Sequence, residues 1–240
     1  MDTFIALLTA HLLSGFPLQP GALAERKRNP LILIGHALIV MAVTILILGS
    51  APPLLLAILI LTHLAMDAVK IWLLPDRLWA FGLDQMVRLI VLIALAWGWA
   101  DLISEGLWSA LPYGFRPFYI VGLVILSSLI INLQVGAIII RLGVRGLDPG
   151  QAEDGLPNGG YLIGCLERLL IIILVFMGQP GGVGFLIAAK SILRFGEIQK
   201  NERKMSEYII IGTFMSFGWG LLVSSLTYWF VSPWLSTVTY

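Results

Sequence analysis

The feature that most constrains this chain is a succession of apolar runs separated by short stretches rich in proline and glycine. The hydrocarbon core of a bilayer is about 30 Å thick, and roughly 20 helical residues cross it. Eight runs approach or reach that length, the first and seventh being short: 2–16, 31–49, 53–72, 79–100, 119–142, 161–178, 183–197 and 206–231. The pattern predicts an all-α, polytopic transmembrane helical bundle of about seven to eight hydrophobic segments.

Composition supports this class of protein. Hydrophobic residues make up 58% of the chain and charged residues 12%, whereas soluble domains are about 45–50% apolar. We expect one integral membrane domain over residues 1–240, with histidine-bearing helices in 1–72 and a charged hairpin and last helix in 161–231. The net charge of +1 is spread over short clusters. This excludes a basic surface for nucleic acid.

Lysine and arginine are distributed unevenly between alternate connections, which predicts the orientation. One set of connections and adjoining helix ends holds Arg26, Lys27, Arg28, Lys70, Arg77, Arg141, Arg145, Lys200, Arg203 and Lys204. The opposite set holds only Arg116. Because cytoplasmic loops carry the excess of basic residues, we expect the basic loops in the cytoplasm. If all eight segments cross, both termini lie outside; if the first is only interfacial, the N-terminus lies inside.

The chain has three histidines, one on each of the first three segments. His11, His36 and Asp67 each lie five residues from the predicted cytoplasmic end of their segment, and His63 lies one turn from Asp67 on the same helix face. Imidazole and carboxylate at one depth are the ligand types of a zinc, manganese or iron site. The alternative is a set of helix-packing histidines bonded to backbone carbonyls or water.

A second polar cluster is expected in the hairpin over 161–197, where a charge at the bilayer centre costs about 2.5–3.5 kcal/mol unless it turns inward and pairs. Glu167 and Arg194 lie at matching distances from the turn near Pro180 and should face each other. The predicted ion-pair network comprises Glu167, Arg168, Lys190, Arg194 and Glu197. It is either a structural set of buried pairs or an anion or headgroup pocket. We expect Asp84 and Arg88 to reach the same cytoplasmic half.

Several stretches together resemble a known family. They are residues 163–170, 184–195 and 202–208 in the later half, and His11–Leu13, Phe16–Gln19, His36, His63, Asp67 and Lys70 in the earlier half. Through them the chain resembles the bacterial integral membrane family called domain of unknown function 3307. The resemblance implies a multi-helix protein of the bacterial inner membrane and no substrate. By analogy, the N-terminal half is also similar to membrane-bound metal-dependent hydrolases, which carry histidines and aspartates on successive helices.

The chain departs from this family pattern at two positions. The family usually carries an acidic residue where Gly15 stands and often a histidine where Val40 stands. Both missing groups are potential metal ligands. We therefore expect a non-catalytic accessory or structural subunit of a larger inner-membrane complex, with other membrane-protein subunits and lipids as partners and a cytoplasm-facing polar pocket. Two alternatives remain: a metal-dependent membrane hydrolase that uses His11, His36, His63 and Asp67 with a divalent metal, and a lipid- or pigment-binding membrane protein.

Overall fold

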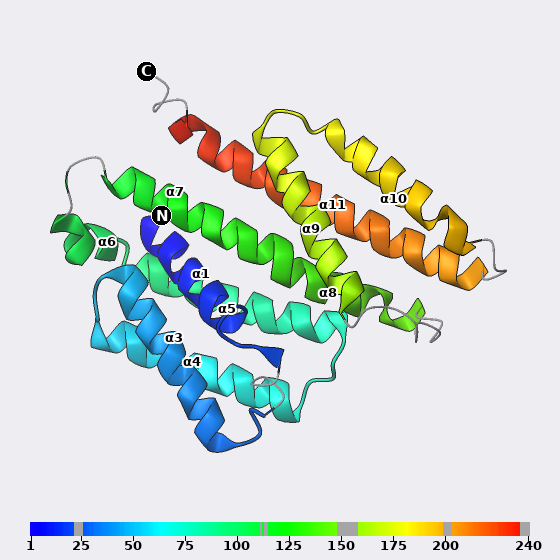
Figure 1. The fold of residues 1–240 in the computed structure, drawn as a ribbon. Coiled ribbons are helices and arrows are strands. Elements are labelled where there is room, and N and C mark those ends of the chain that lie inside the picture. The colour runs from blue at the N-terminus through cyan, green and yellow to red at the C-terminus, as the bar shows by residue number, and fades with distance from the viewer. Residues whose placement is uncertain (22–25, 111, 113–114, 148–157, 199–202, 236–240) are drawn as a thin grey trace. The chain divides into compact units, whose positions relative to one another are not determined.

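The computed structural model describes residues 1–21, 26–110, 112, 115–147, 158–198 and 203–235, and not the side chains of 193–198, 203, 205 and 235. These residues form helices and no strand (Figure 1). The α-helices are α1 (Asp2–Gly15), α3 (Pro30–Leu48), α4 (Pro53–Trp72), α5 (Leu78–Gly98), α6 (Leu102–Glu105), α7 (Phe115–Ile130), α8 (Gly136–Val144), α9 (Gly159–Phe176), α10 (Gly182–Ile198) and α11 (Arg203–Leu235). Short 3₁₀-helices η1 (Leu107–Ala110) and η3 (Arg145–Leu147) and the π-helix η2 (Ile131–Val135) complete them.

The predicted helical bundle is confirmed. Six helical segments are long and apolar enough to cross a membrane: Pro30–Leu48, Pro53–Trp72, Leu78–Gly98, Phe115–Leu147, Gly159–Phe176 and Ser206–Trp234. The helices Asp2–Gly15 and Gly182–Ile192 are apolar but shorter, as the run lengths predicted. Length and composition therefore indicate a multi-pass membrane protein.

The chain divides into two compact units, Met1–Ile130 and Ile131–Tyr240, and the expectation of a single integral domain stays a prediction. In unit 1 the short helix α1 packs against α3, α5, α6 and α7 (Figure 1). Its buried face includes Ala6, Thr9, Ala10 and Ser14, and small side chains let neighbouring helices approach closely. The Thr9 hydroxyl also lies 2.8 Å from Ser127 Oγ on α7. α1 is therefore the centre of unit 1, although it is shorter than the six helical segments named above.

Local sequence signals set the ends of α3. The Asn29 side chain accepts a hydrogen bond from the Leu31 backbone amide at 3.0 Å, and Pro30 occupies the first helical position, where its missing N–H costs nothing. At the other end, Gly49 adopts φ +65°, and a Cβ there would lie 2.6 Å from the Trp108 ring. Trp108 Nε1 donates to the Ile47 carbonyl at 2.9 Å. Only glycine fits this end of α3 without strain.

In unit 2, α11 packs against α8, α9 and α10. Ile171, Val175, Val183 and Phe217 form a buried apolar cluster. The π-helix η2 opens backbone carbonyls that an α-helix would use internally. The Arg168 side chain donates to two of them, Asn132 O at 2.8 Å and Leu133 O at 3.1 Å, so an arginine of α9 completes the hydrogen bonding of η2.

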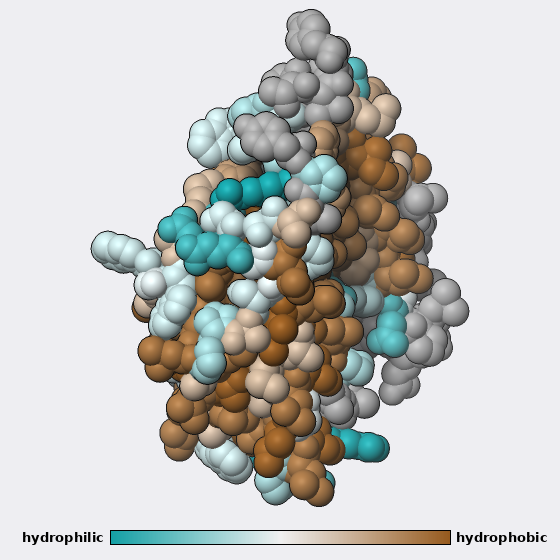
Figure 2. Space-filling view, turned by 90° about the vertical axis from the view of Figure 1, so that its left-hand side faces the viewer, coloured by the Kyte–Doolittle hydropathy of each residue, from teal (hydrophilic) through white to brown (hydrophobic). Residues whose placement is uncertain are grey.

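Polar and apolar residues are distributed as expected for a protein in lipid. Large hydrophobic side chains are exposed on the helices, including Leu46, Leu61, Trp97 and Phe185, and hydrophobic residues predominate on the face drawn in Figure 2. Charged and polar side chains are instead buried, among them His36, His63, Asp67, Asp84, Arg88 and Arg168. In water this arrangement would be costly, whereas in a bilayer it places ionisable groups in the protein interior.

Candidate functional site

The candidate site of unit 1 is a buried cluster drawn from three helices and one connection. α4 supplies His63 and Asp67, one turn apart, and α5 supplies Asp84 and Arg88, also one turn apart. His36 comes from α3 and Lys27 from the connection before it. Each of these six residues is at most 8% exposed. Their charges must therefore be balanced within the cluster, because water is not available to do it.

Asp67 is the residue on which the cluster converges. Its Oδ1 accepts a hydrogen bond from Arg88 Nη2 at 2.6 Å, and its Oδ2 accepts one from Lys27 Nζ at 2.6 Å. Both carboxylate oxygens are thus bound by cations of the same chain. Burial lowers the pKa of the Lys27 ammonium from its ordinary value, and the adjacent Asp67 carboxylate acts in the opposite direction.

Arg88 connects the two aspartates. Its Nε donates to Asp84 Oδ1 at 2.7 Å, and its Nη1 donates to His63 Nδ1 at 2.8 Å. The other oxygen of Asp84 accepts from Lys70 Nζ and from Gln85 Nε2, each at 3.0 Å. Asp67 and Asp84 are therefore balanced by Arg88 and Lys27 inside the cluster, with Lys70, 48% exposed, at its edge.

The contacts favour one tautomer for each of the two central histidines. Arg88 Nη1, which can only donate, lies 2.8 Å from His63 Nδ1 and 3.3 Å from its Nε2. The nearer Nδ1 is the better acceptor, which leaves the proton of neutral imidazole on Nε2. His63 Nε2 lies 3.1 Å from His36 Nε2, so His63 donates and His36 accepts. His36 Nδ1 then carries a proton, and it is buried without a hydrogen-bond partner among the described residues.

Three of the four predicted metal ligands come together. Donor atoms of His36, His63 and Asp67 lie within 4.8 Å of one another; Asp67 Oδ2 is 3.9 Å from His36 Nε2 and 3.7 Å from His63 Nε2. Tetrahedral zinc with ligand bonds of 2.0–2.1 Å separates its ligand atoms by about 3.3 Å. The spacing fits a metal, but the lone pairs of these atoms are already committed to Arg88, Lys27 and each other, so a metal would have to displace them.

The fourth predicted ligand, His11, lies beside this group. Its ring centroid is 6.3 Å from that of His63, and its Nε2 is 3.3 Å from Gln85 Oε1. Gln85 Nε2 donates a hydrogen bond to Asp84, and this bond orients Gln85 Oε1 toward His11. His11 therefore joins the cluster through a glutamine rather than through the donor set of His36, His63 and Asp67.

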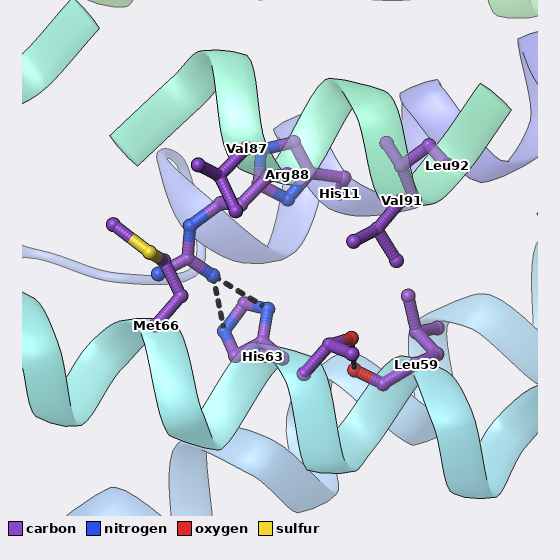
Figure 3. A pocket seen from close by; sticks show the side chains of 9 residues that line it. His11, Leu59, His63, Met66, Val87, Arg88, Val91 and Leu92 are labelled. Atoms are coloured by element: carbon purple, nitrogen blue, oxygen red, sulfur yellow. Dashed lines mark hydrogen bonds between the residues drawn. The ribbon is translucent and has the colours of Figure 1, made fainter. Parts of the chain in front are cut away.

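A small pocket lies between α1, α4 and α5 next to the cluster. Its polar lining is His11, His63 and Arg88, together with Thr62, and its apolar lining is Leu59, Met66, Val87, Val91 and Leu92 (Figure 3). In Figure 3 the Arg88 guanidinium points at the His63 ring with Met66 and Val87 beside it, while Leu59, Val91 and Leu92 lie at the other end. The pocket therefore sets a few polar groups in a mostly apolar lining.

The second predicted cluster differs from our expectation. Glu167 pairs with Lys190, with Nζ 2.8 Å from the carboxylate. Arg168 does not join that pair in the described part of the chain; it turns to the carbonyls of η2 and to Ser216 Oγ at 2.9 Å, because the π-helix offers it neutral acceptors. The side chains of Arg194 and Glu197 lie outside the described residues.

Sequence reasoning missed most of the counter-charges of the first cluster. The sequence places Asp84 and Arg88 only in the cytoplasmic half, whereas in the structure Arg88 binds Asp67, His63 and Asp84. Lys27 was used only to assign orientation. The available signal was the spacing of Asp84 and Arg88, one turn apart in an apolar run, which is typical of a buried pair that needs further partners.

The fold defines a class of protein, a helical protein with the marks of a multi-pass membrane protein. Residues 3–109 match the family model described as "Protein of unknown function (DUF3307)", which confirms the predicted resemblance for this segment. The matched segment contains the whole cluster of unit 1, and the family's description names no activity. No curated protein and no solved structure matches the chain.

Proposed function

We propose that this chain is a non-catalytic accessory or structural subunit of a larger complex in the bacterial inner membrane. The observation that carries the proposal is the closure of the buried cluster by the chain's own cations: Lys27 and Arg88 take both oxygens of Asp67. A catalytic metal site keeps a ligand position open for water or substrate. Here the imidazoles and the carboxylate that could bind a metal are instead bonded to one another, to Lys27 and to Arg88.

The pairs join different parts of unit 1. Lys27 links the connection before α3 to α4, Arg88 links α5 to α4, and His36 links α3 to α4 through His63. Breaking a buried ion pair by removal of one partner costs about 3–5 kcal/mol. The cluster thus suits a role in fixing the relative positions of three helices, whose exposed apolar faces would meet lipid and partner subunits.

The experiment is copurification of the tagged chain from bacterial membranes in mild detergent. The proposal predicts that defined membrane proteins accompany the chain in constant ratio. A chain that migrates alone in several mild detergents contradicts it. A topology reporter fused after Tyr240 tests the proposed orientation, in which the basic loops and the polar pocket face the cytoplasm. If all eight segments cross, the reporter should be active on the outer side of the membrane.

A metal-dependent membrane hydrolase is the second candidate, favoured by the spacing of donor atoms of His36, His63 and Asp67. It requires Lys27 and Arg88 to move away from Asp67 when metal binds. Metal analysis of the purified protein before and after His36→Ala decides this candidate. One equivalent of metal that the substitution removes supports the hydrolase, whereas no stoichiometric metal rejects it.

A further inference from the structure

We propose that the pocket beside Arg88 binds the carbonyl group of a neutral lipid, and this goes beyond a role as an accessory subunit. The pocket is lined by Arg88 and His63, both more than nine-tenths buried, and by apolar side chains of α4 and α5 (Figure 3). A few polar groups in a mostly apolar lining fit a molecule with one polar group on a hydrocarbon chain.

Arg88 has an unused hydrogen-bond donor. A guanidinium has five N–H groups. Asp84 accepts from Nε, both ring nitrogens of His63 lie within hydrogen-bond distance of Nη1, and Asp67 accepts from Nη2. The second N–H of Nη2 has no acceptor among the described residues. An unpaired donor in an apolar environment is costly, and a ligand oxygen would remove that cost.

The pocket is small. The cavity volume is about 20 Å³, and about 10–15 Å³ of such volume holds one water molecule. The space next to Arg88 therefore admits a single carbonyl oxygen, not a phosphate or a sugar headgroup. Val87 is 37% exposed and Val91 is half-buried. The pocket therefore opens on the face of α5 that would contact lipid, and the hydrocarbon part of the ligand would continue from there into the bilayer.

Charge and depth narrow the class of lipid that fits the pocket. Within the buried cluster, the charges of Lys27 and Arg88 balance those of Asp67 and Asp84, which favours a neutral ligand over an anion. Arg88 lies ten residues after Leu78, the first residue of α5, so its Cα is about 15 Å along the helix. Two lipid classes carry a neutral carbonyl on an apolar chain: prenylated quinones and acyl esters.

The experiment measures the thermal stability of the detergent-purified full chain with three probes. These are a short-tailed ubiquinone, a diester phosphatidylcholine, and the diether analogue that lacks the carbonyl groups. A bound ligand raises the unfolding temperature in a concentration-dependent way. We expect stabilisation by ubiquinone, or by the diester but not the diether, and these two results assign the ligand to a quinone or to an acyl ester.

Variants tie the response to this pocket. Val91→Trp fills the opening while leaving the ion pairs in place, and we expect at least about tenfold weaker binding. Ile90→Trp is the matched control, because Ile90 is the neighbouring residue on α5, is 59% exposed and does not line the pocket. Arg88→Lys should weaken binding similarly if it folds. Three results would overturn the proposal. The first is no stabilisation by any probe, and the second is an equal effect of diester and diether without a response to ubiquinone. The third is unchanged binding in Val91→Trp.

Discussion

Replacement of Arg88 by methionine tests whether the buried cluster holds unit 1 together. Arg88 contacts Asp67 at 2.6 Å, Asp84 at 2.7 Å and His63 at 2.8 Å. Methionine keeps most of the side-chain volume but removes the charge, so two buried carboxylates lose a shared partner. Removal of one member of a buried ion pair costs about 3–5 kcal/mol, and the Asp84 and Asp67 contacts both contribute here. We expect Arg88→Met to lower the free energy of unfolding by an amount in this range.

The chain supplies a matched control in a second arginine–aspartate pair. Arg116 Nη2 lies 2.8 Å from Asp2 Oδ2, but the Arg116 side chain is 52% exposed. An exposed pair contributes about 0–1 kcal/mol, so Arg116→Met should have little effect. The measurement is the free energy of unfolding in mixed micelles titrated with a denaturing detergent. Equal losses for the two substitutions would refute the account of the cluster.

A neutralised cluster distinguishes a structural role from a chemical one. When all members of a buried charge network are replaced by residues of similar shape, stability is often unchanged or increased. We therefore expect the quadruple variant Lys27→Met, Asp67→Asn, Asp84→Asn, Arg88→Met to recover most of the stability that Arg88→Met loses, because Lys27 would otherwise stay buried without its partner. If the quadruple variant is less stable than Arg88→Met, the paired charges are not what makes the single substitution costly.

Three further substitutions test other parts of the fold by the same unfolding measurement. Gly49→Ala forces a side chain into a positive-φ conformation and against Trp108, so we expect a loss of about 2–4 kcal/mol; no loss would show that this helix end adapts freely. Arg168→Met leaves carbonyls of η2 without a donor and should lower the free energy of unfolding by about 2–4 kcal/mol. A negligible change would contradict the role of Arg168 in the hydrogen bonding of η2. Lys190→Ala removes the partly exposed partner of Glu167 and should cost about 1 kcal/mol, so a loss as large as that of Arg168→Met would contradict the lesser role given to this pair.

The helices were predictable because their signal is strong and local. Apolar runs bounded by Gly49 or Pro53 predict helix ends within a few residues. The short 3₁₀ and π elements were not predicted, because η2 depends on donors from distant residues such as Arg168 and Trp219. Local patterns carry no information on such contacts.

The candidate site was predictable only in part. Helix periodicity and equal depth brought His36, His63 and Asp67 together in the prediction, and the structure brings them together. Periodicity does not say which helices are neighbours, so the contacts of Arg88 with Asp67 and His63 were not predicted. Lys27 lies outside a helix, where no periodicity applies, and its contact with Asp67 follows from tertiary packing alone.

Native mass spectrometry of the complex released from membranes in mild detergent tests the central claim most directly, because it reports partners and bound metal in one spectrum. The account predicts this chain in a heteromeric assembly of fixed stoichiometry, with the mass of the chain free of any metal ion. A chain released without partners and carrying one metal ion, which His36→Ala removes, would contradict the account and favour the hydrolase.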